Sequence, residues 1–134
     1  MSEDGRKANE VTPAALGALV RRFYARARQD ALLGPVFESA IQDWNPHMEQ
    51  ITAFWTTAVL GTKTYRGNPL AAHRKHPLTP EMFDRWLALW AETASELFER
   101  QAAIDLAEQA QRMAGSLRAG LFFDPKAANA STRP

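Results

Sequence analysis

The sequence predicts an all-α fold, and three observations support this. Apolar residues recur at spacings of three and four in several segments of the 134-residue chain, which is the period of a helix with one buried face. β-branched residues alternate with polar residues nowhere over a useful length, so strand signals are nearly absent. Thr-Pro pairs and a glycine stand where these segments begin and end, as in capped helices. A chain of this length is expected to form one domain with its own core.

The first helix is expected to begin at Thr12-Pro13, because threonine caps a helix and proline suits its first position. Its buried stripe consists of Leu16, Leu19, Val20 and Phe23, with Tyr24 beside it. The pattern stops near Asp30, and the following ALLGPVFESAI segment is expected to be a turn region with one buried aromatic residue, Phe37.

The second long helix is expected to start after Asp43, which can cap it, and to tolerate Pro46 in its first turn. Gly61 is expected to end it in a left-handed conformation. A loop with the sequence TKTYRGNP follows, and a short helix should then run from Asn68-Pro69 until Pro77 ends it.

Thr79-Pro80 is expected to cap the next helix, whose stripe consists of Phe83, Trp86, Leu87, Trp90, Ala94 and Leu97. The last helix should run from about residue 101 to 121 with an inward face of Ile104, Ala107, Ala114, Leu117 and Leu121. Residues 1–11 and 123–134 are expected to be disordered, which leaves 12–122 as the folded domain.

Composition excludes several classes of protein. Lys plus Arg number 16 and Asp plus Glu 15, which argues against a nucleic-acid-binding protein. The absence of cysteine excludes disulfides, iron–sulfur clusters, thiolate zinc sites and the covalent attachment of a c-type haem. The polar start contains no signal peptide, and no apolar run reaches the length of a membrane span. We therefore expect a cytoplasmic protein with no membrane partner.

The three histidines are the candidate metal ligands. His47 shares an apolar helical face with Ile51, Phe54 and Ala58, although a core histidine bonded to a backbone carbonyl would give the same pattern. His73 shares a face of the short helix with Leu70.

The surroundings of His76 differ from those of the other two histidines. It directly precedes Pro77 and lies beside two basic residues, so it is expected to be a solvated loop residue. A zinc site on all three histidines would have poor geometry. The H-E-x-x-H motif, a glutamate three residues before a histidine, a glycine-rich phosphate loop and the G-x-S-x-G motif are all absent.

Haem accounts for these features together. It needs a wide apolar slot, aromatic walls and one strong axial histidine. The chain has four Trp, seven Phe and two Tyr, mostly within helical patterns. A short helix with one inward histidine can face a long helix with a second, which is the arrangement of helices around the pocket of a globin.

The chain resembles a truncated haemoglobin, most closely the third group of that family, over about residues 13 to 121. The matching pieces are FY at Phe23-Tyr24, D-x-L-L-G-P-V-F from Asp30, W-x-x-H from Trp44 to His47, FW at Phe54-Trp55, Y-x-G-x-P-L-x-x-H from Tyr65 to His73, and F-x-x-W-L from Phe83. Their order and spacing together are specific. The other groups have Gly-Gly pairs that this chain lacks.

The resemblance implies a two-over-two helical sandwich around haem. It makes His73 the proximal ligand of the haem iron, Tyr24 and Trp86 the residues that stabilise a distal ligand, and His47 a distal gate. The pocket walls that it implies are Phe23, Phe37, Ile51, Trp55, Leu70, Met113 and Leu117. Contacts to the haem propionates are implied for Tyr65, Arg66 and Arg74.

The cofactor expected is non-covalent haem b, with O2, NO and CO as ligands. Bound oxygen becomes partly anionic, and the hydroxyl of Tyr24 and the indole of Trp86 are donors that could stabilise this charge. Two strong donors would slow release, so nitric oxide dioxygenation or peroxide cleavage is favoured over bulk oxygen transport. An electron-donating reductase is the expected partner. The alternatives are a non-enzymatic gas sensor or store, and a haem-free helical interaction module.

Overall fold

The computed structural model describes residues 7–61, 73, 76 and 78–122. Within this part the chain forms α1 (Pro13–Ala27), α2 (Gly34–Ala40), α3 (Trp44–Leu60), α5 (Pro80–Leu97) and α6 (Arg100–Phe122), and no strand. The all-α prediction is therefore confirmed. The short helix expected at 68–76 lies outside the described residues, except for His73 and His76.

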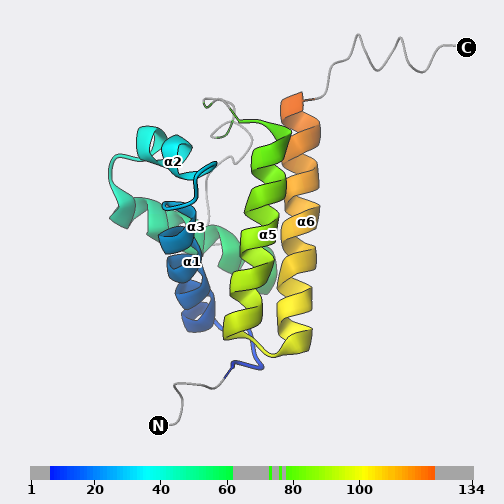
Figure 1. Cartoon of the computed structure of the whole chain (residues 1–134). Coiled ribbons are helices and arrows are strands. Elements are labelled where there is room, and N and C mark those ends of the chain that lie inside the picture. The colour runs from blue at the N-terminus through cyan, green and yellow to red at the C-terminus, as the bar shows by residue number, and fades with distance from the viewer. Residues whose placement is uncertain (1–6, 62–72, 74–75, 77, 123–134) are drawn as a thin grey trace, which may run out of the picture.

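The long helices form two packed pairs. In Figure 1, α5 and α6 run side by side, α1 lies next to α5, and α3 passes behind α1 and packs on it. The pairs α1/α3 and α5/α6 thus give the expected two-over-two sandwich. Residues of α3 and α5, one helix from each pair, line the same cavity at one end of the sandwich.

The helix ends follow the sequence signals. Thr12 and Thr79 accept hydrogen bonds from the backbone N–H groups of Ala15 and Met82, at 3.1 Å and 3.3 Å. Asp43 accepts from Asn45 at the start of α3. Gly61 ends α3 with a φ of 72°, which L-residues with a side chain rarely adopt. These four predicted boundaries are confirmed.

The segment expected to be a turn region contains a helix, so that prediction is wrong. Asp30 caps the turn before α2, because its carboxylate accepts from the N–H groups of Leu32 and Leu33, both at 3.0 Å. Pro35 then stands in the first turn of α2, where its missing N–H is harmless. Gly34 is required where α1 and α2 meet, since a Cβ there would lie 2.5 Å from the carbonyl oxygen of Arg28.

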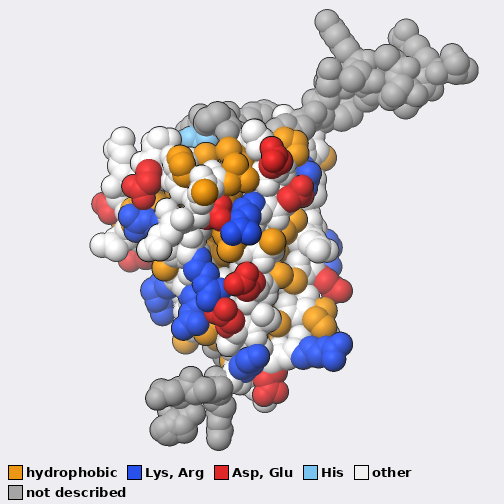
Figure 2. All heavy atoms as spheres, viewed as in Figure 1, with side chains coloured by type: hydrophobic (Ala, Val, Ile, Leu, Met, Phe, Trp, Pro, Cys, Tyr) orange, Lys and Arg blue, Asp and Glu red, His pale blue; other side chains and the backbone are white. Residues whose placement is uncertain are grey.

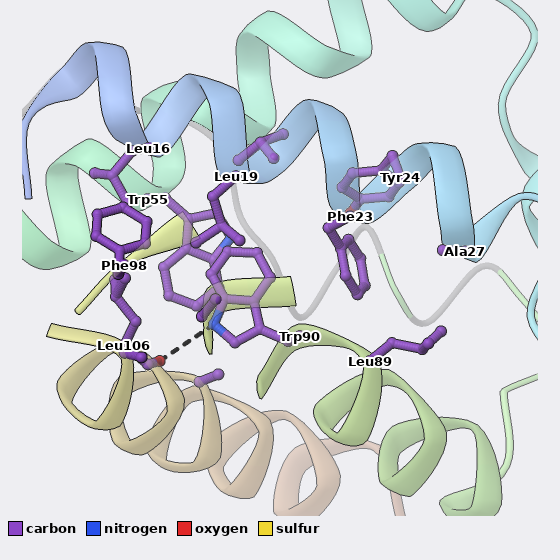
Figure 3. Packing of buried hydrophobic residues seen from close by; sticks show 14 of the residues in the cluster. Leu16, Leu19, Phe23, Tyr24, Ala27, Trp55, Leu89, Trp90, Phe98 and Leu106 are labelled. Carbon is purple, nitrogen blue, oxygen red and sulfur yellow. Dashed lines mark hydrogen bonds between the residues drawn. The ribbon is translucent and has the colours of Figure 1, made fainter. Parts of the chain in front are cut away.

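The core lies between α1 and α5. Its largest fully buried side chains are Trp90, Phe23, Phe98, Leu16, Leu19, Leu106 and Val20, several of which Figure 3 shows packed together. Two side chains that were predicted to face inward do not: Ile104 is 38% exposed, and Ala58 is exposed. Ala103 and Leu106 are buried in place of Ile104, because α6 is rotated slightly from the face that the apolar spacing suggested.

The N-terminal segment is fixed at residue 8, within the region expected to be disordered. Ala8 donates to the carbonyl of Leu97 at 2.9 Å and accepts from the N–H of Glu99 at 2.8 Å. It thereby covers the corner between α5 and α6. The C-terminal tail from 123 lies outside the described residues.

The outer surface between α1 and α5 is lined with ion pairs. Arg22 and Arg26 both contact Glu96, and Arg26 also contacts Glu92. Figure 2 shows basic and acidic side chains interspersed on the face that carries α1 and α5. Among the described helices, none has the length and hydropathy needed to cross a lipid bilayer.

Candidate functional site

One end of the sandwich encloses a cavity of about 500 Å³. Its described walls come from α1, α2, α3, α5 and α6 and from both histidines of the 73–76 segment. Most of the lining is apolar or aromatic, and no Asp, Glu, Lys or Arg of the described residues belongs to it. The volume lies within the range of roughly 300–1,000 Å³ that is typical of cofactor and ligand pockets.

The cavity brings all three histidines together. His47 from α3, His73 and His76 each line it and are half-buried. The backbone N–H of His76 donates to the carbonyl of His73 at 3.2 Å, so the two are one turn apart. His76 was expected to be a solvated loop residue. It lies in a bend and is half-buried, and it also lines the cavity, which was not expected.

The cavity lowers the pKa of His47 below its ordinary value. Burial of the imidazole is the larger cause, and the charge of His73 adds to it. Both effects disfavour the protonated form of His47 in an apolar space. The neutral form of His47 is therefore favoured. Among the described residues no cluster of three His, Cys, Asp or Glu side chains has the geometry of a metal site, so a zinc site on the three histidines is not supported.

Tyr24 and Trp86 meet at the inner wall of the cavity. Tyr24 is 6% exposed, and burial raises the pKa of its hydroxyl far above the ordinary value, opposed in part by a hydrogen bond with Trp86. Since an indole can only donate, the N–H of Trp86 points to the Tyr24 oxygen. The phenol hydrogen of Tyr24 then remains to be donated to a further acceptor.

Aromatic rings fix the orientation of Tyr24 and His47. The Tyr24 ring meets Phe37 and His47 edge-on, with centroids 5.3 Å and 5.8 Å away. Trp44 packs at 90° against His47 at 5.7 Å, and the guanidinium of Arg28 covers Trp44 at 4.3 Å. Such edge-to-face contacts favour one ring orientation. The polar groups of the cavity are therefore held by packing.

An ion pair connects the α2 wall to α5. The side chain of Asp30 is 6% exposed, and Arg85 donates to it at 2.6 Å. Burial acts to raise the pKa of Asp30, but the N–H of Leu33, Arg85 and the N–H of Leu32 together lower it below its ordinary value. Asp30 therefore stays ionised and holds the start of α2, which carries Phe37 into the cavity.

The predicted site residues fall into three sets. Nine line the cavity: His73, Tyr24, Trp86, His47, Phe37, Ile51, Trp55, Met113 and Leu117. Phe23 does not; it is fully buried one layer deeper, with its ring 5.3 Å from that of Trp86. Leu70, Tyr65, Arg66 and Arg74 lie outside the described residues.

Several wall residues were missed by the sequence reasoning. They are Leu33, Val36, Ala40, Ile41, Gln50, Phe54, His76, Leu78, Met82, Phe83 and Ala114. Some could have been found, because Phe54 and Phe83 stand three residues from Ile51 and Trp86 on the same helices. The residues from α2 could not, since that helix was not predicted.

These residues fit a haem group. A flat apolar macrocycle needs an apolar, aromatic-walled slot, and the iron needs an imidazole in the wall. The cavity offers both, with His73 and His47 as the imidazoles and a pair of donors at Tyr24 and Trp86. Because the chain contains no cysteine, it has no thiol to which haem could be attached through a thioether bond.

Comparisons with known proteins agree with this geometry. Residues 12–118 match the family described as bacterial-like globin. The group 3 truncated hemoglobin ctb of Campylobacter jejuni is 30% identical over 121 residues, covering 87% of this chain and 95% of the relative. The crystal structure of the group III truncated hemoglobin from Campylobacter jejuni superposes with a TM-score of 0.81 at 30% identity, over 87% of this chain and 95% of that chain. The chain therefore belongs to the bacterial-like globins, which bind haem, and within them it is a truncated haemoglobin of the third group.

Proposed function

We propose that the protein holds haem b non-covalently through His73 and uses it for chemistry on oxygen with nitric oxide or on peroxide, rather than for bulk oxygen transport. The observation that supports this is the pair of donors, Tyr24 and Trp86, in an otherwise apolar cavity. Haem supplies binding of diatomic gases and one-electron chemistry when it is bound. The residues of the chain would hold the haem, admit the gas and donate hydrogen bonds to the bound ligand.

His73 is the proposed axial ligand, and His47 the proposed gate. His73 lines the cavity from the short segment next to α5, where an imidazole can reach the iron. His47 favours its neutral form and is held between the Tyr24 and Trp44 rings. A neutral imidazole of this kind can turn to admit a gas without the cost of moving a charge through an apolar space.

Tyr24 and Trp86 are the proposed donors to the ligand. An oxygen ligand gains partial negative charge, and hydrogen bonds to charged acceptors are about twice as strong as neutral ones. The low polarity of the cavity strengthens them further. A carrier would lose its oxygen slowly under these conditions, whereas a reaction on the retained oxygen benefits. Repeated turnover would need electrons from outside the chain, and we propose an electron-donating reductase as the partner that would supply them.

The first test is titration of the purified protein with hemin, followed by the Soret band. His73→Ala is expected to lose stable haem or to change its spectrum to that of iron without an axial imidazole. His76→Ala is the matched control, because it removes a neighbouring imidazole that lines the same cavity, and its spectrum should stay normal. The reverse result would show that His76 is the ligand, and a protein that takes up no hemin would refute the proposal.

The second test distinguishes turnover from gas storage. The reduced, oxygen-loaded protein is mixed with nitric oxide, and separately the ferric protein is given hydrogen peroxide, each with an electron donor. Nitrate formation or repeated peroxide consumption is expected. If Tyr24→Phe turns over as fast as the wild type in both assays, the donors have no catalytic role, and a gas sensor or store becomes the better proposal.

A further inference from the structure

Three indoles form a parallel stack that leads from the cavity into the core. Trp86 and Trp55 line the cavity, and Trp90 lies behind them with no exposed surface. The ring planes of Trp55 and Trp90 are 19° apart with centroids 4.3 Å apart, and those of Trp86 and Trp90 are 6° apart at 5.5 Å. Figure 3 shows Trp55 against Trp90 within the core.

Packing alone does not require this arrangement. Aromatic pairs in proteins adopt offset-stacked and edge-to-face geometries, and the rings around Tyr24 are edge-to-face or tilted. The stack joins helices from both pairs of the sandwich, since Trp55 belongs to α3 and the other two to α5. Among the rings of the cavity wall, an indole loses an electron most readily when no proton is released with it, and parallel rings in contact share a positive charge between them.

We propose that this stack is an internal electron donor, which reduces strong one-electron oxidants formed in the cavity and thereby protects the haem from peroxide. The inference rests on the proposed function, because it needs bound haem and a peroxide. Trp86 is the entry point, and Trp90, which is buried behind the cavity wall and stacks on Trp55, holds the electron vacancy away from the cavity.

Hydrogen peroxide would react with the ferric haem group when that group is bound. The O–O bond breaks; one oxygen atom leaves as water with both peroxide protons, and the other stays with the haem group until a later reduction. The cleavage takes two electrons, of which the haem group gives one and an indole the other. The indole becomes a radical cation and keeps its N–H proton. A one-electron reductant such as ascorbate later returns the missing electron.

The surroundings of Trp90 suit a positive charge. Its N–H donates to the carbonyl oxygen of Leu106 at 3.2 Å, the bond drawn in Figure 3. A hydrogen bond strengthens when its donor becomes charged, so this carbonyl stabilises the oxidised ring. Being fully buried, Trp90 is also shielded from oxygen and water that would destroy it.

Tyr24 is the competing donor at the cavity wall, and its environment opposes oxidation. A phenol must release its proton when it loses an electron at ordinary pH. Burial raises the pKa of Tyr24 well above its ordinary value, so that release is disfavoured. An indole loses an electron without this requirement, and the vacancy passes to the stack.

The experiment uses the full chain loaded with hemin in the ferric state. Samples are mixed with hydrogen peroxide, freeze-quenched for electron paramagnetic resonance, and digested to map oxidised residues by mass spectrometry. The variants are Trp90→Phe and Trp55→Phe, so that the test survives if one of them does not fold. Trp44→Phe is the matched control, because it removes an indole that lies outside the stack while the phenylalanine keeps an aromatic ring against Tyr24 and His47.

The expected result is a tryptophan radical in the wild type and oxidised indoles at Trp86, Trp55 or Trp90. Both stack variants should lose most of this signal and bleach their Soret band faster, whereas Trp44→Phe should match the wild type. Haem-free protein under the same peroxide should oxidise methionines but spare the stack. An unchanged radical and bleaching rate in both stack variants, or oxidation centred on Trp44 or Tyr24, would overturn the inference. Failure to bind hemin would instead refute the proposed function.

Discussion

Replacing Tyr24 with phenylalanine removes one oxygen atom from the cavity and keeps the ring in its edge-to-face contacts with Phe37 and His47. Trp86→Phe likewise removes one N–H. In the ligand-free protein these two atoms bond each other. When oxygen binds, Trp86 can turn its N–H from Tyr24 to the ligand, while the Tyr24 hydroxyl donates to the same ligand. The ligand thus gains two hydrogen bonds, and the hydrogen bond between Trp86 and Tyr24 is lost.

The magnitudes follow from this exchange. A hydrogen bond to a charged group contributes about 1.5–3 kcal/mol, and the neutral bond that is given up about 1 kcal/mol. Either single variant loses one ligand bond but no longer gives up the neutral bond, so its net loss is about 0.5–2 kcal/mol. Oxygen release should accelerate roughly two- to thirtyfold in each single variant. The double variant loses both hydrogen bonds to the ligand and has no Tyr24–Trp86 bond to break. Its acceleration of oxygen release should therefore exceed the product of the accelerations in the two single variants by roughly fivefold.

The measurement is stopped-flow dissociation of oxygen and carbon monoxide from the wild type, both single variants and the double variant. Carbon monoxide carries much less negative charge when bound, so its release should change far less and serves as the control ligand. Equal effects on the two gases would mean that the residues act by shape alone, and the donor mechanism would have to be abandoned. A double variant equal to the product of the singles would refute the Tyr24–Trp86 exchange.

Three further predictions concern the walls of the cavity. Asp30→Asn should lower the free energy of unfolding in urea by about 1.5–3 kcal/mol at pH 7, whereas Asp84→Asn, which breaks an exposed ion pair, should cost less than about 1 kcal/mol. Since the pKa of Asp30 is lowered on folding, its contribution is present above the unfolded value of about 4 and is lost as the pH falls below it, so wild type and variant should converge in acid. Gly34→Ala should destabilise by about 1–3 kcal/mol in thermal unfolding, because its Cβ would meet a backbone oxygen; an unchanged midpoint would show that α1 and α2 are less tightly joined. His47→Leu should raise the carbon monoxide association rate in flash photolysis and leave oxygen release nearly unchanged, whereas strongly faster oxygen release would make His47 a ligand donor rather than a gate.

The parts of the fold that the sequence predicted are those where a local signal agrees with the tertiary structure. Thr12, Asp43, Gly61 and Thr79 mark helix ends because a cap bonds to backbone groups two to four residues away. The α2 helix was not predicted because it is short. The bonds of Asp30 at its start, to Leu33 and to Arg85, combine a local turn with a residue 55 positions along the chain.

In the site, too, local sequence signals predicted some residues, whereas the positions of others depended on tertiary contacts. Histidine spacing and aromatic content indicated a haem pocket with His73 and His47 in its walls, and both line the cavity. The position of His76 depended on a turn whose direction the sequence pattern does not give. Phe23 was placed one layer too far out, because a helical stripe shows which residues are buried but not whether a cavity or another side chain covers them.

The sequence by itself determined the helical class, the capped ends and the residue types able to hold haem, because period and capping act over a few residues. The tertiary structure alone decided that Trp86 reaches the Tyr24 hydroxyl, that His47 lies between the Tyr24 and Trp44 rings with its pKa lowered, and that Trp55 from α3 stacks on Trp90 from α5. These contacts join residues many positions apart, and their geometry depends on how the rigid helices cross and on which side chains fill the space between them.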